Sequence, residues 1–316
     1  MKLEKVAPTS ERLLAEVSKA IVGKDEVLHF VLLAILCDGH VLIEDFPGLA
    51  KTLMAKSFAA ALGCTFRRVQ FTPDLLPADI TGTYVFDKKR SEFELRKGPI
   101  FTHILLADEI NRAPPKTQAA LLEAMQERQT TLEGETYPLE SPFIVIATQN
   151  PIEYEGTYPL PEAQIDRFLV RIRMGYPEGE DEVEVLERRR ARKREEVEIG
   201  AIADPEKVQA LQRAMEEVHV ERDVERYIVE LVQRTREHPN VEVGASPRGS
   251  LALMTLSRAK AALASRDFVL PDDVKGVALP GLAHRIILKP DPWIRGVKTE
   301  TVVEQVLAEV PVPTVG

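Results

Sequence analysis

The sequence has few of the residues that mark secreted, metal-binding or membrane proteins. It has two cysteines in 316 residues, Cys37 and Cys64, and both lie in apolar helical segments. Metal sites need closely spaced cysteine or histidine ligands, so these two are predicted to be buried thiols. No apolar run is long enough to span a membrane, and the N-terminal segment lacks the apolar core of a signal peptide. These absences predict a cytoplasmic protein without membrane insertion.

The sequence also has fewer basic than acidic residues. The chain has 41 lysines and arginines against 50 aspartates and glutamates, a formal net charge of −9. This balance argues against a general nucleic-acid binder, which commonly has a basic surface. The basic run 188–194 lies between acidic stretches on one predicted helix, and we interpret it as a solvated, salt-bridged face. With 44% hydrophobic and 29% charged residues the chain is typical of a globular protein, and its length allows two domains.

The order of predicted elements favours an α/β fold followed by a helical region. Residues 1–176 alternate helical spacing with short apolar strands, which predicts a parallel sheet covered by helices on both faces. Two β-rich segments, at about 82–98 and 130–142, predict hairpins that serve either as surface decorations or as contact elements. Residues 177–310 have helical patterns only, which predicts a second, all-helical domain. A loose Pro-rich tail is predicted for residues 311–316.

The segment DFPGLAKTL, from Asp45 to Leu53, nearly matches a phosphate-binding loop. That loop has the pattern Gly, four residues, Gly, Lys, Ser or Thr. Lys51 and Thr52 are in place, but Asp45 and Ala50 stand where the glycines belong. Asp tolerates positive φ better than most residues, and Ala50 is expected to have negative φ at the start of a helix. Lys51 is predicted to bridge the terminal phosphates, and Thr52 to offer its hydroxyl to Mg²⁺.

Two acidic residues, Asp108 and Glu109, end the apolar strand of the segment HILLADEIN. Ligands bind at the carboxyl edge of an open parallel sheet, so both acids are expected at a ligand site. Asp108 is predicted to hold the Mg²⁺ shell and Glu109 to polarise an attacking water. Strands often end in acids at the surface, but the nearby phosphate loop favours the functional interpretation.

Three polar residues further along the chain are weaker candidates. Asn150 ends the apolar strand of IATQNP and could reach the same sheet edge, or could belong to an ordinary turn before proline. Arg167, in PEAQIDRF, is a candidate arginine finger or one half of a surface ion pair with Asp166. Arg248 lies at a predicted helix start, where a cation opposes the helix dipole, which suggests that it faces an anion.

The sequence resembles the MoxR family of AAA+ ATPases. The resemblance rests on EDFPGLAKT, LLADEINRAPPKTQAALLEAMQE, ATQNPIEYEGTYPLPEAQIDRF and GASPRG, which occur in the family's order. It covers about residues 10–300. It implies a P-loop NTPase core with a parallel five-stranded sheet and a helical lid, assembled as a hexameric ring that binds ATP and Mg²⁺. The family varies at both odd loop positions, which supports a working loop.

The resemblance also implies roles for individual residues. Asn150 matches sensor 1, Arg167 matches an arginine finger acting on the neighbouring subunit, and Arg248 matches sensor 2. The two hairpins match the helix-2 insert and the pre-sensor 1 insert. Catalytic roles fall to Glu109, Lys51, Asn150, Arg167 and Arg248, and metal binding to Thr52 and Asp108. The nucleotide-binding set is Ile21, Val22, Gly23, Phe46, Pro47, Gly48, Leu49, Ala50, Lys51, Thr52 and Leu53, of which the first three belong to the adenine pocket.

Members of this family resemble chaperones for partners with von Willebrand factor A domains, often in metal insertion or complex assembly. A magnesium-chelatase-like motor subunit shares the architecture and differs mainly in its partner. A ring translocase on DNA is another alternative, because FDKKRSEF has three consecutive basic residues. A nucleotide-binding scaffold without turnover is a third, favoured by the missing glycines. The client is not identified by any residue of the hairpins.

Overall fold

The computed structural model describes residues 3–150 and 156–313, and a parallel β-sheet lies at its centre. The sheet has five strands in the order β2-β5-β8-β1-β9, and every neighbouring pair is parallel. They are β1 (Val41–Glu44), β2 (Phe66–Gln70), β5 (Ile104–Asp108), β8 (Ile144–Gln149) and β9 (Val170–Ile172). The predicted α/β class with a five-stranded parallel sheet is therefore confirmed.

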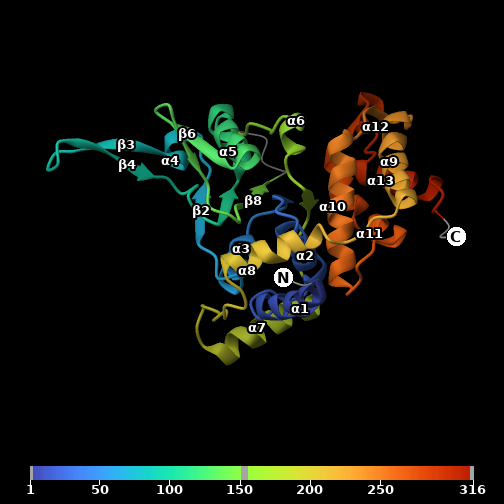
Figure 1. Cartoon of the computed structure of the whole chain (residues 1–316), viewed down its shortest axis with the longest axis horizontal. Helices are drawn as coiled ribbons and strands as arrows, with labels where there is room; N and C mark the ends of the chain where they lie inside the picture. Colours follow the sequence, from blue (N-terminus) through green and yellow to red (C-terminus); the bar gives the residue numbers. More distant parts are fainter. Residues whose placement is uncertain (1–2, 151–155, 314–316) are drawn as a thin grey trace.

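Helices cover both faces of this sheet because strand residues alternate between the faces. Val41 and Ile43 share one hydrophobic cluster with the three N-terminal helices, whereas Leu42 between them belongs to a second cluster with Leu121. The N-terminal helices lie on one face and α5 on the other (Figure 1). The helices of this part are α1 (Val6–Val17), α2 (Asp25–Leu36), α3 (Lys51–Ala61), α4 (Pro77–Thr81), α5 (Pro115–Glu127) and α6 (Glu162–Ile165).

Two antiparallel hairpins extend from the sheet layer. The first is formed by β3 (Gly82–Asp87) and β4 (Glu92–Lys97), and the second by β6 (Gln129–Leu132) and β7 (Glu135–Pro138). The first projects far from the body of the molecule (Figure 1). The hydroxyl of Tyr84 donates a hydrogen bond to Glu135 Oε2 at 3.0 Å, so the two hairpins touch each other.

The C-terminal part is helical except for one small sheet. Its helices are α7 (Gly179–Arg192), α8 (Pro205–Met215), α9 (Arg222–Glu237), α10 (Pro247–Leu263), α11 (Pro271–Leu282), α12 (Pro290–Ile294) and α13 (Thr299–Glu309). The sequence patterns predicted no strand here, but β10 (Val241–Val243) pairs antiparallel with β11 (Ile287–Leu288). Strands this short have no periodic signal of their own, and their pairing depends on contacts between distant segments.

The first two helices of this part lie against the α/β core, and the second of them, α8, also contacts α10 of the group α9 to α13 (Figure 1). The Arg188 guanidinium of α7 donates to Ser18 O at 2.6 Å, and Gln212 of α8 donates to Ile35 O at 2.9 Å. A division of the chain near residue 176 therefore separates α7 and α8 from the core that they contact, and the domain boundary stays a proposal.

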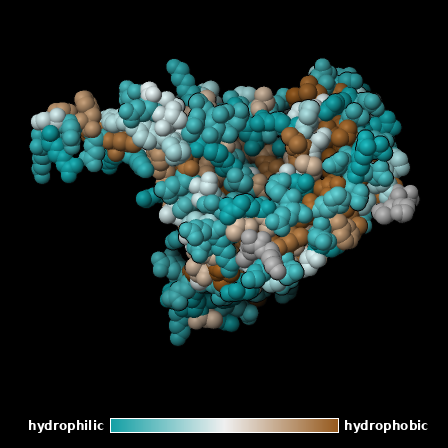
Figure 2. Space-filling view, viewed as in Figure 1, coloured by the Kyte–Doolittle hydropathy of each residue, from teal (hydrophilic) through white to brown (hydrophobic). Residues whose placement is uncertain are grey.

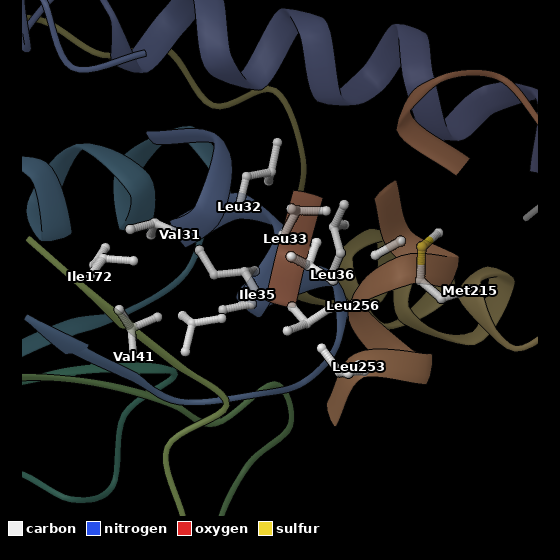
Figure 3. Close-up of a cluster of buried hydrophobic side chains, with 14 of the residues drawn as sticks. Val31, Leu32, Leu33, Ile35, Leu36, Val41, Ile172, Met215, Leu253 and Leu256 are labelled. Atoms are coloured by element: carbon white, nitrogen blue, oxygen red, sulfur yellow. The ribbon is translucent and has the colours of Figure 1, made fainter. Parts of the chain in front are cut away.

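One apolar cluster joins the core to the helical part. Val31, Leu33 and Leu36 of α2 lie between the sheet and side chains of α8 and α10, among them Met215 and Leu256 (Figure 3). Leu33 and Leu36 are 0% exposed, and burial of such side chains is the main stabilising term in folding. The cluster thus resists a change in the position of α10 relative to the sheet.

Neither cysteine forms a disulfide. Cys37 and Cys64 are free, and each is partly buried against the main hydrophobic cluster. Burial raises the pKa of both thiols, that of Cys64 to about 12. No helix within residues 3–150 or 156–313 combines the length and the apolar composition needed to cross a membrane.

Candidate active site

The loop of residues 45–50 connects β1 to α3, as the sequence predicts for a phosphate-binding loop. Asp45 is 5% exposed, and its carboxylate accepts hydrogen bonds from the backbone N–H of Phe46 at 2.9 Å and of Gly175 at 2.5 Å. Gly175 lies shortly after β9, the edge strand that pairs with β1. The side chain of Asp45 therefore ties the loop to the segment that leads into α7.

The left-handed residues of this loop are Gly48, with φ of +86°, and Ala50, with φ of +56°. The expectation of negative φ at Ala50 is therefore wrong, and Asp45 has no need of the positive φ that the sequence analysis allowed it. The chain enters α3 from a left-handed N-cap, so the residue before Lys51 belongs to the turn and not to the helix. For a non-glycine residue this conformation costs about 1–2 kcal/mol.

Lys51 begins α3 and folds back over the loop. Its ammonium donates to the carbonyl oxygens of Asp45 at 2.9 Å and Phe46 at 3.0 Å. Burial lowers the pKa of Lys51, while the charges of Asp45, Asp108 and Glu109 act in the opposite direction. The cation thus faces three carboxylates at the carboxyl ends of β1 and β5, two strands that are separated in the sheet by β8.

Asp108 lies at the carboxyl end of β5 and is held on both sides. Its Oδ1 accepts a hydrogen bond from the hydroxyl of Thr148 at 2.7 Å, and its Oδ2 accepts two from the guanidinium of Arg68 at 3.0 and 2.7 Å. The same hydroxyl accepts a hydrogen bond from the backbone N–H of Glu109 at 2.8 Å. Thr148 therefore fixes both acids relative to β8.

Glu109 has φ of +56°, a conformation that non-glycine residues rarely adopt and that tends to occur at functional sites. Its Oε2 accepts hydrogen bonds from Gln70 at 2.6 Å and from Arg112 at 2.8 Å. Both partners hold the carboxylate at the carboxyl edge of the sheet, beside β2.

One cavity of about 380 Å³ brings most of the predicted residues together, within the size range of small-ligand sites. Asn150 lies in its wall and is 8% exposed. The predicted residues in its lining are Pro47, Gly48, Leu49, Ala50, Lys51, Thr52, Leu53, Asp108, Glu109 and Asn150. Arg68, Gln70 and Thr148 also line it, and the sequence analysis did not single them out.

The segment expected to contact adenine lies outside the lining of this cavity. Ile21 is 4% exposed, and Gly23 has φ of +66°. A Cβ added to Gly23 would lie 1.9 Å from the carboxylate of Asp181, so the first turn of α7 lies directly against this segment. Phe46, also outside the lining, stacks on Tyr176 with ring centroids 5.9 Å apart. The assignment of Ile21, Val22 and Gly23 to adenine stays a prediction.

Arg167 and Arg248 lie in a second groove, of about 330 Å³, and not in the cavity of Lys51. Asp166 pairs with Arg285 at 2.8 Å and lies 3.8 Å from Arg248, which identifies the anion that Arg248 faces. Within the described parts of the chain no ion pair joins Asp166 to Arg167, so that alternative for Arg167 is wrong.

The sequence held weak signals for the residues that were missed. Arg68 and Gln70 alternate along β2, which places both side chains on the same side of that strand. Thr148 lies in β8, two residues before Asn150, which directly follows that strand. None of these residue types is diagnostic of a nucleotide site, because polar side chains on strand ends are common.

Comparison with known proteins places the chain among AAA proteins. A family model for the ATPase family associated with various cellular activities (AAA) matches residues 40–170, and one for the AAA lid domain matches 233–306. The chain is 47% identical to the uncharacterized protein YeaC of Bacillus subtilis, over 98% of this chain and 97% of that protein.

Two further relatives carry more informative names. The chain is 44% identical to Chaperone MoxR1 of Mycobacterium tuberculosis, over 97% of this chain and 83% of that protein. It is also 40% identical to a candidate ATPase of known structure from Cytophaga hutchinsonii, with a TM-score of 0.92 over 98% of this chain and 96% of that one. The chain therefore belongs to the MoxR family of AAA+ ATPases.

Proposed function

We propose that this chain hydrolyses ATP with Mg²⁺ in a ring of identical copies, and that each active site is completed by arginines of a neighbouring copy. One observation carries this proposal. The cavity with Lys51, Asp108 and Glu109 is separate from the groove with Arg167 and Arg248. Phosphoryl transfer needs cations to stabilise charge on the transferred group, and an arginine supplied by another subunit is one known solution.

The loop and the start of α3 are suited to hold a triphosphate. Backbone N–H groups of residues 48–52 and the N-terminal end of α3 favour anions. The Lys51 ammonium binds two carbonyl oxygens of the loop in this structure, and phosphate oxygens would take their place as its partners. Asp45 keeps the loop in position through Gly175 and does not need to contact the nucleotide.

The oxygen ligands present fit a magnesium ion. Mg²⁺ prefers oxygen donors and usually takes one or two from the protein, with waters and substrate phosphates completing its shell. The Thr52 hydroxyl and the Asp108 carboxylate both line the cavity beside Lys51 and can act as these donors. When bound, the ion would supply positive charge that offsets the negative charge of the phosphates.

Hydrolysis is assigned to the acids and amide at the sheet edge. Glu109 accepts a proton from the attacking water, and Asn150 orients that water from the adjacent strand. In this structure Gln70 and Arg112 both donate to Oε2 of Glu109, which orients the carboxylate and leaves its Oε1 as the oxygen to accept the proton of the water. Arg167 and Arg248 of the neighbouring copy stabilise charge at the γ-phosphate.

The geometry thus extends the role expected for Arg248. The family resemblance matches Arg248 to sensor 2 and does not say on which copy's nucleotide it acts. Because Arg248 shares a groove with Arg167 through Asp166, any copy that presents one arginine also presents the other. We therefore assign both to the same neighbouring site.

We further propose that the ring is a cytoplasmic hexamer and works as a chaperone that remodels or matures a partner complex, one of whose members has a von Willebrand factor A domain. The name of the relative Chaperone MoxR1 supports the chaperone role. Figure 2 shows hydrophobic atoms on the projecting hairpin β3–β4. Its Phe86 and Phe93 side chains are 48% and 69% exposed and contact each other edge to face. Exposed aromatic side chains are common in protein contacts.

The test is ATP hydrolysis measured against protein concentration, with Lys51→Ala and Arg167→Ala beside the wild type. Lys56→Ala, on the exposed face of α3, and Arg226→Ala, on the exposed face of α9, are the matched controls. Specific activity that rises with concentration and is lost only in the first two variants supports the proposal. ATP binding without hydrolysis at any concentration, with or without cell extract, would replace it with the scaffold alternative.

A further inference from the structure

The groove that holds Arg167 and Arg248 is unusually rich in arginine for its size. Four arginines line it, Arg128, Arg167, Arg248 and Arg285, with only two aspartates among the lining residues described. One of the two, Asp38, pairs with Arg128 at 3.2 Å. The other aspartate, Asp166, is paired with two of the remaining arginines, Arg285 and Arg248, and is the residue next to the third, Arg167.

Asp166 receives three groups from the helical part of the chain. Its Oδ1 lies 2.8 Å from Arg285 Nε, in an ion pair whose angle departs from that of a hydrogen bond. Its Oδ2 lies 3.8 Å from Arg248 Nη1 and accepts a hydrogen bond from the Ser246 hydroxyl at 3.4 Å. Ser246 is the N-cap of α10, so the carboxylate contacts the end of the helix from which Arg248 projects.

Arg285, which pairs with Asp166, also binds the backbone on both sides of Arg167. Its side chain is 4% exposed and donates to the carbonyl oxygens of Phe168 at 2.8 Å, Leu169 at 3.3 Å and Asp166 at 3.4 Å. Arg285 ends the 3-10 turn η3 (Ala283–Arg285), which directly follows α11. The backbone on both sides of Arg167 is therefore bound by one buried guanidinium of the helical part.

These contacts hold Arg167 and Arg248, which lie 81 positions apart in the sequence, close to one another. Without the carboxylate, Arg248 and Arg285 would repel each other at close range, and a buried guanidinium would have no counter-charge. The repulsion would push the start of α10 away from the segment of Arg167. An arginine that stabilises a transition state must hold its position to within about 1 Å, because small displacements reduce the rate strongly.

We propose that Asp166 is a positioning residue, whose carboxylate holds Arg167 and Arg248 in a fixed relation so that both reach the ATP of a neighbouring copy together. The inference rests on the proposed function, in which the arginines act in trans. Asp166 acts through the two arginines and needs no contact of its own with the nucleotide. Its loss damages the site of the neighbour and leaves the phosphate loop of its own chain intact.

The test combines Asp166→Asn with subunit mixing. Alone, Asp166→Asn is expected to lower kcat at least tenfold and to leave the affinity for ADP unchanged. The matched control is Glu162→Gln, which removes one exposed carboxylate at the start of α6 and should leave kcat unchanged. Asp166→Glu keeps the negative charge, so its kcat should lie between those of Asp166→Asn and the wild type. If Asp166→Asn does not fold, Asp166→Glu takes its place in the test.

Asp166→Asn is then mixed before assembly with Lys51→Ala, in which Arg167, Arg248 and Asp166 are intact. Each inactive variant supplies what the other lacks, so activity should return to about one quarter of the wild-type rate in an equal, random mixture of copies that contact head to tail. Arg167→Ala mixed with Lys51→Ala is run in parallel as the reference for trans action.

Three results overturn the inference. Full activity of Asp166→Asn removes the positioning role. Loss of activity that mixing does not restore, while Arg167→Ala is restored, places the defect of Asp166→Asn in its own fold or phosphate loop. If mixing restores neither variant, the arginines do not act in trans, and the proposed function fails together with the inference.

Discussion

Arg68 binds Asp108, the predicted magnesium ligand, through two hydrogen bonds from its guanidinium to Oδ2, at 3.0 and 2.7 Å. The arginine side chain is 47% exposed and the aspartate side chain 13% exposed. A cation on this oxygen competes with a metal ion for the same carboxylate. We therefore predict that this pair raises the Mg²⁺ concentration needed at the proposed site.

Replacing Arg68 by leucine is expected to lower the Mg²⁺ concentration for half-maximal ATPase activity. An exposed ion pair contributes about 0.2–1 kcal/mol, which corresponds to a change of roughly 1.4- to 5-fold. Arg67→Leu, at the neighbouring exposed position of β2, is the control and should leave the Mg²⁺ dependence unchanged. Equal Mg²⁺ titration curves for the wild type and Arg68→Leu would show that the pair does not compete.

Glu109→Gln is expected to retain ATP without turning it over. The amide keeps an oxygen that can accept the hydrogen bonds of Gln70 and Arg112, so the local geometry persists, but the amide cannot take a proton. Loss of a general base lowers the rate by about 10²- to 10⁴-fold. The nucleotide that remains bound after gel filtration, identified by chromatography, gives the measurement. Glu123→Gln on the exposed face of α5 is the control, and normal turnover by the Glu109 variant would refute the role of this residue.

Ala50→Gly restores the glycine of the common loop pattern and is expected to stabilise the protein, even though it removes a methyl group. Ala50 has φ of +56°, where glycine has no steric penalty, so the gain should be about 1 kcal/mol. Thermal unfolding followed by circular dichroism measures it. Ala60→Gly, inside α3, is the opposite control and should lower the melting temperature. A lower melting temperature for Ala50→Gly would mean that the left-handed conformation is not strained.

The contact between the two hairpins is expected to weaken in acid. Hydrogen bonds from Tyr137 and then Tyr84 lower the pKa of Glu135 below its usual 4.5, because they stabilise the carboxylate. A group with a lowered pKa in the folded state contributes its interaction above the ordinary pKa and loses it as the pH falls through the lowered value. The contact should therefore be complete at pH 7 and be lost only as the pH falls through the lowered pKa of Glu135.

Chemical shifts of the Tyr84 and Tyr137 rings, followed by NMR from pH 7 downwards, report this transition. Glu135→Gln should remove the pH dependence of both rings, while Glu133→Gln, at the neighbouring exposed position of the turn, should leave it in place. Tyrosine rings that titrate in Glu135→Gln as they do in the wild type would assign the transition to another group.

The sequence by itself determined the order of the core elements and the place of the phosphate loop. Apolar strand runs, helical spacing and residues such as Lys51 or Asp108 act within a window of a few positions, and a parallel sheet brings all its strand ends to one edge. That is why Lys51, Thr52, Asp108, Glu109 and Asn150 line one cavity, while their roles there stay a prediction.

Only the tertiary structure decided the relations between distant segments. The partner of Asp45 is Gly175, the residue that fixes Asp108 is Thr148, and the anion that faces Arg248 is Asp166. No local pattern encodes such pairs, because they depend on how whole helices and strands pack. Even the sign of φ at Ala50 follows from where the chain must turn to reach α3, and the sequence there reads equally well as the first turn of a helix.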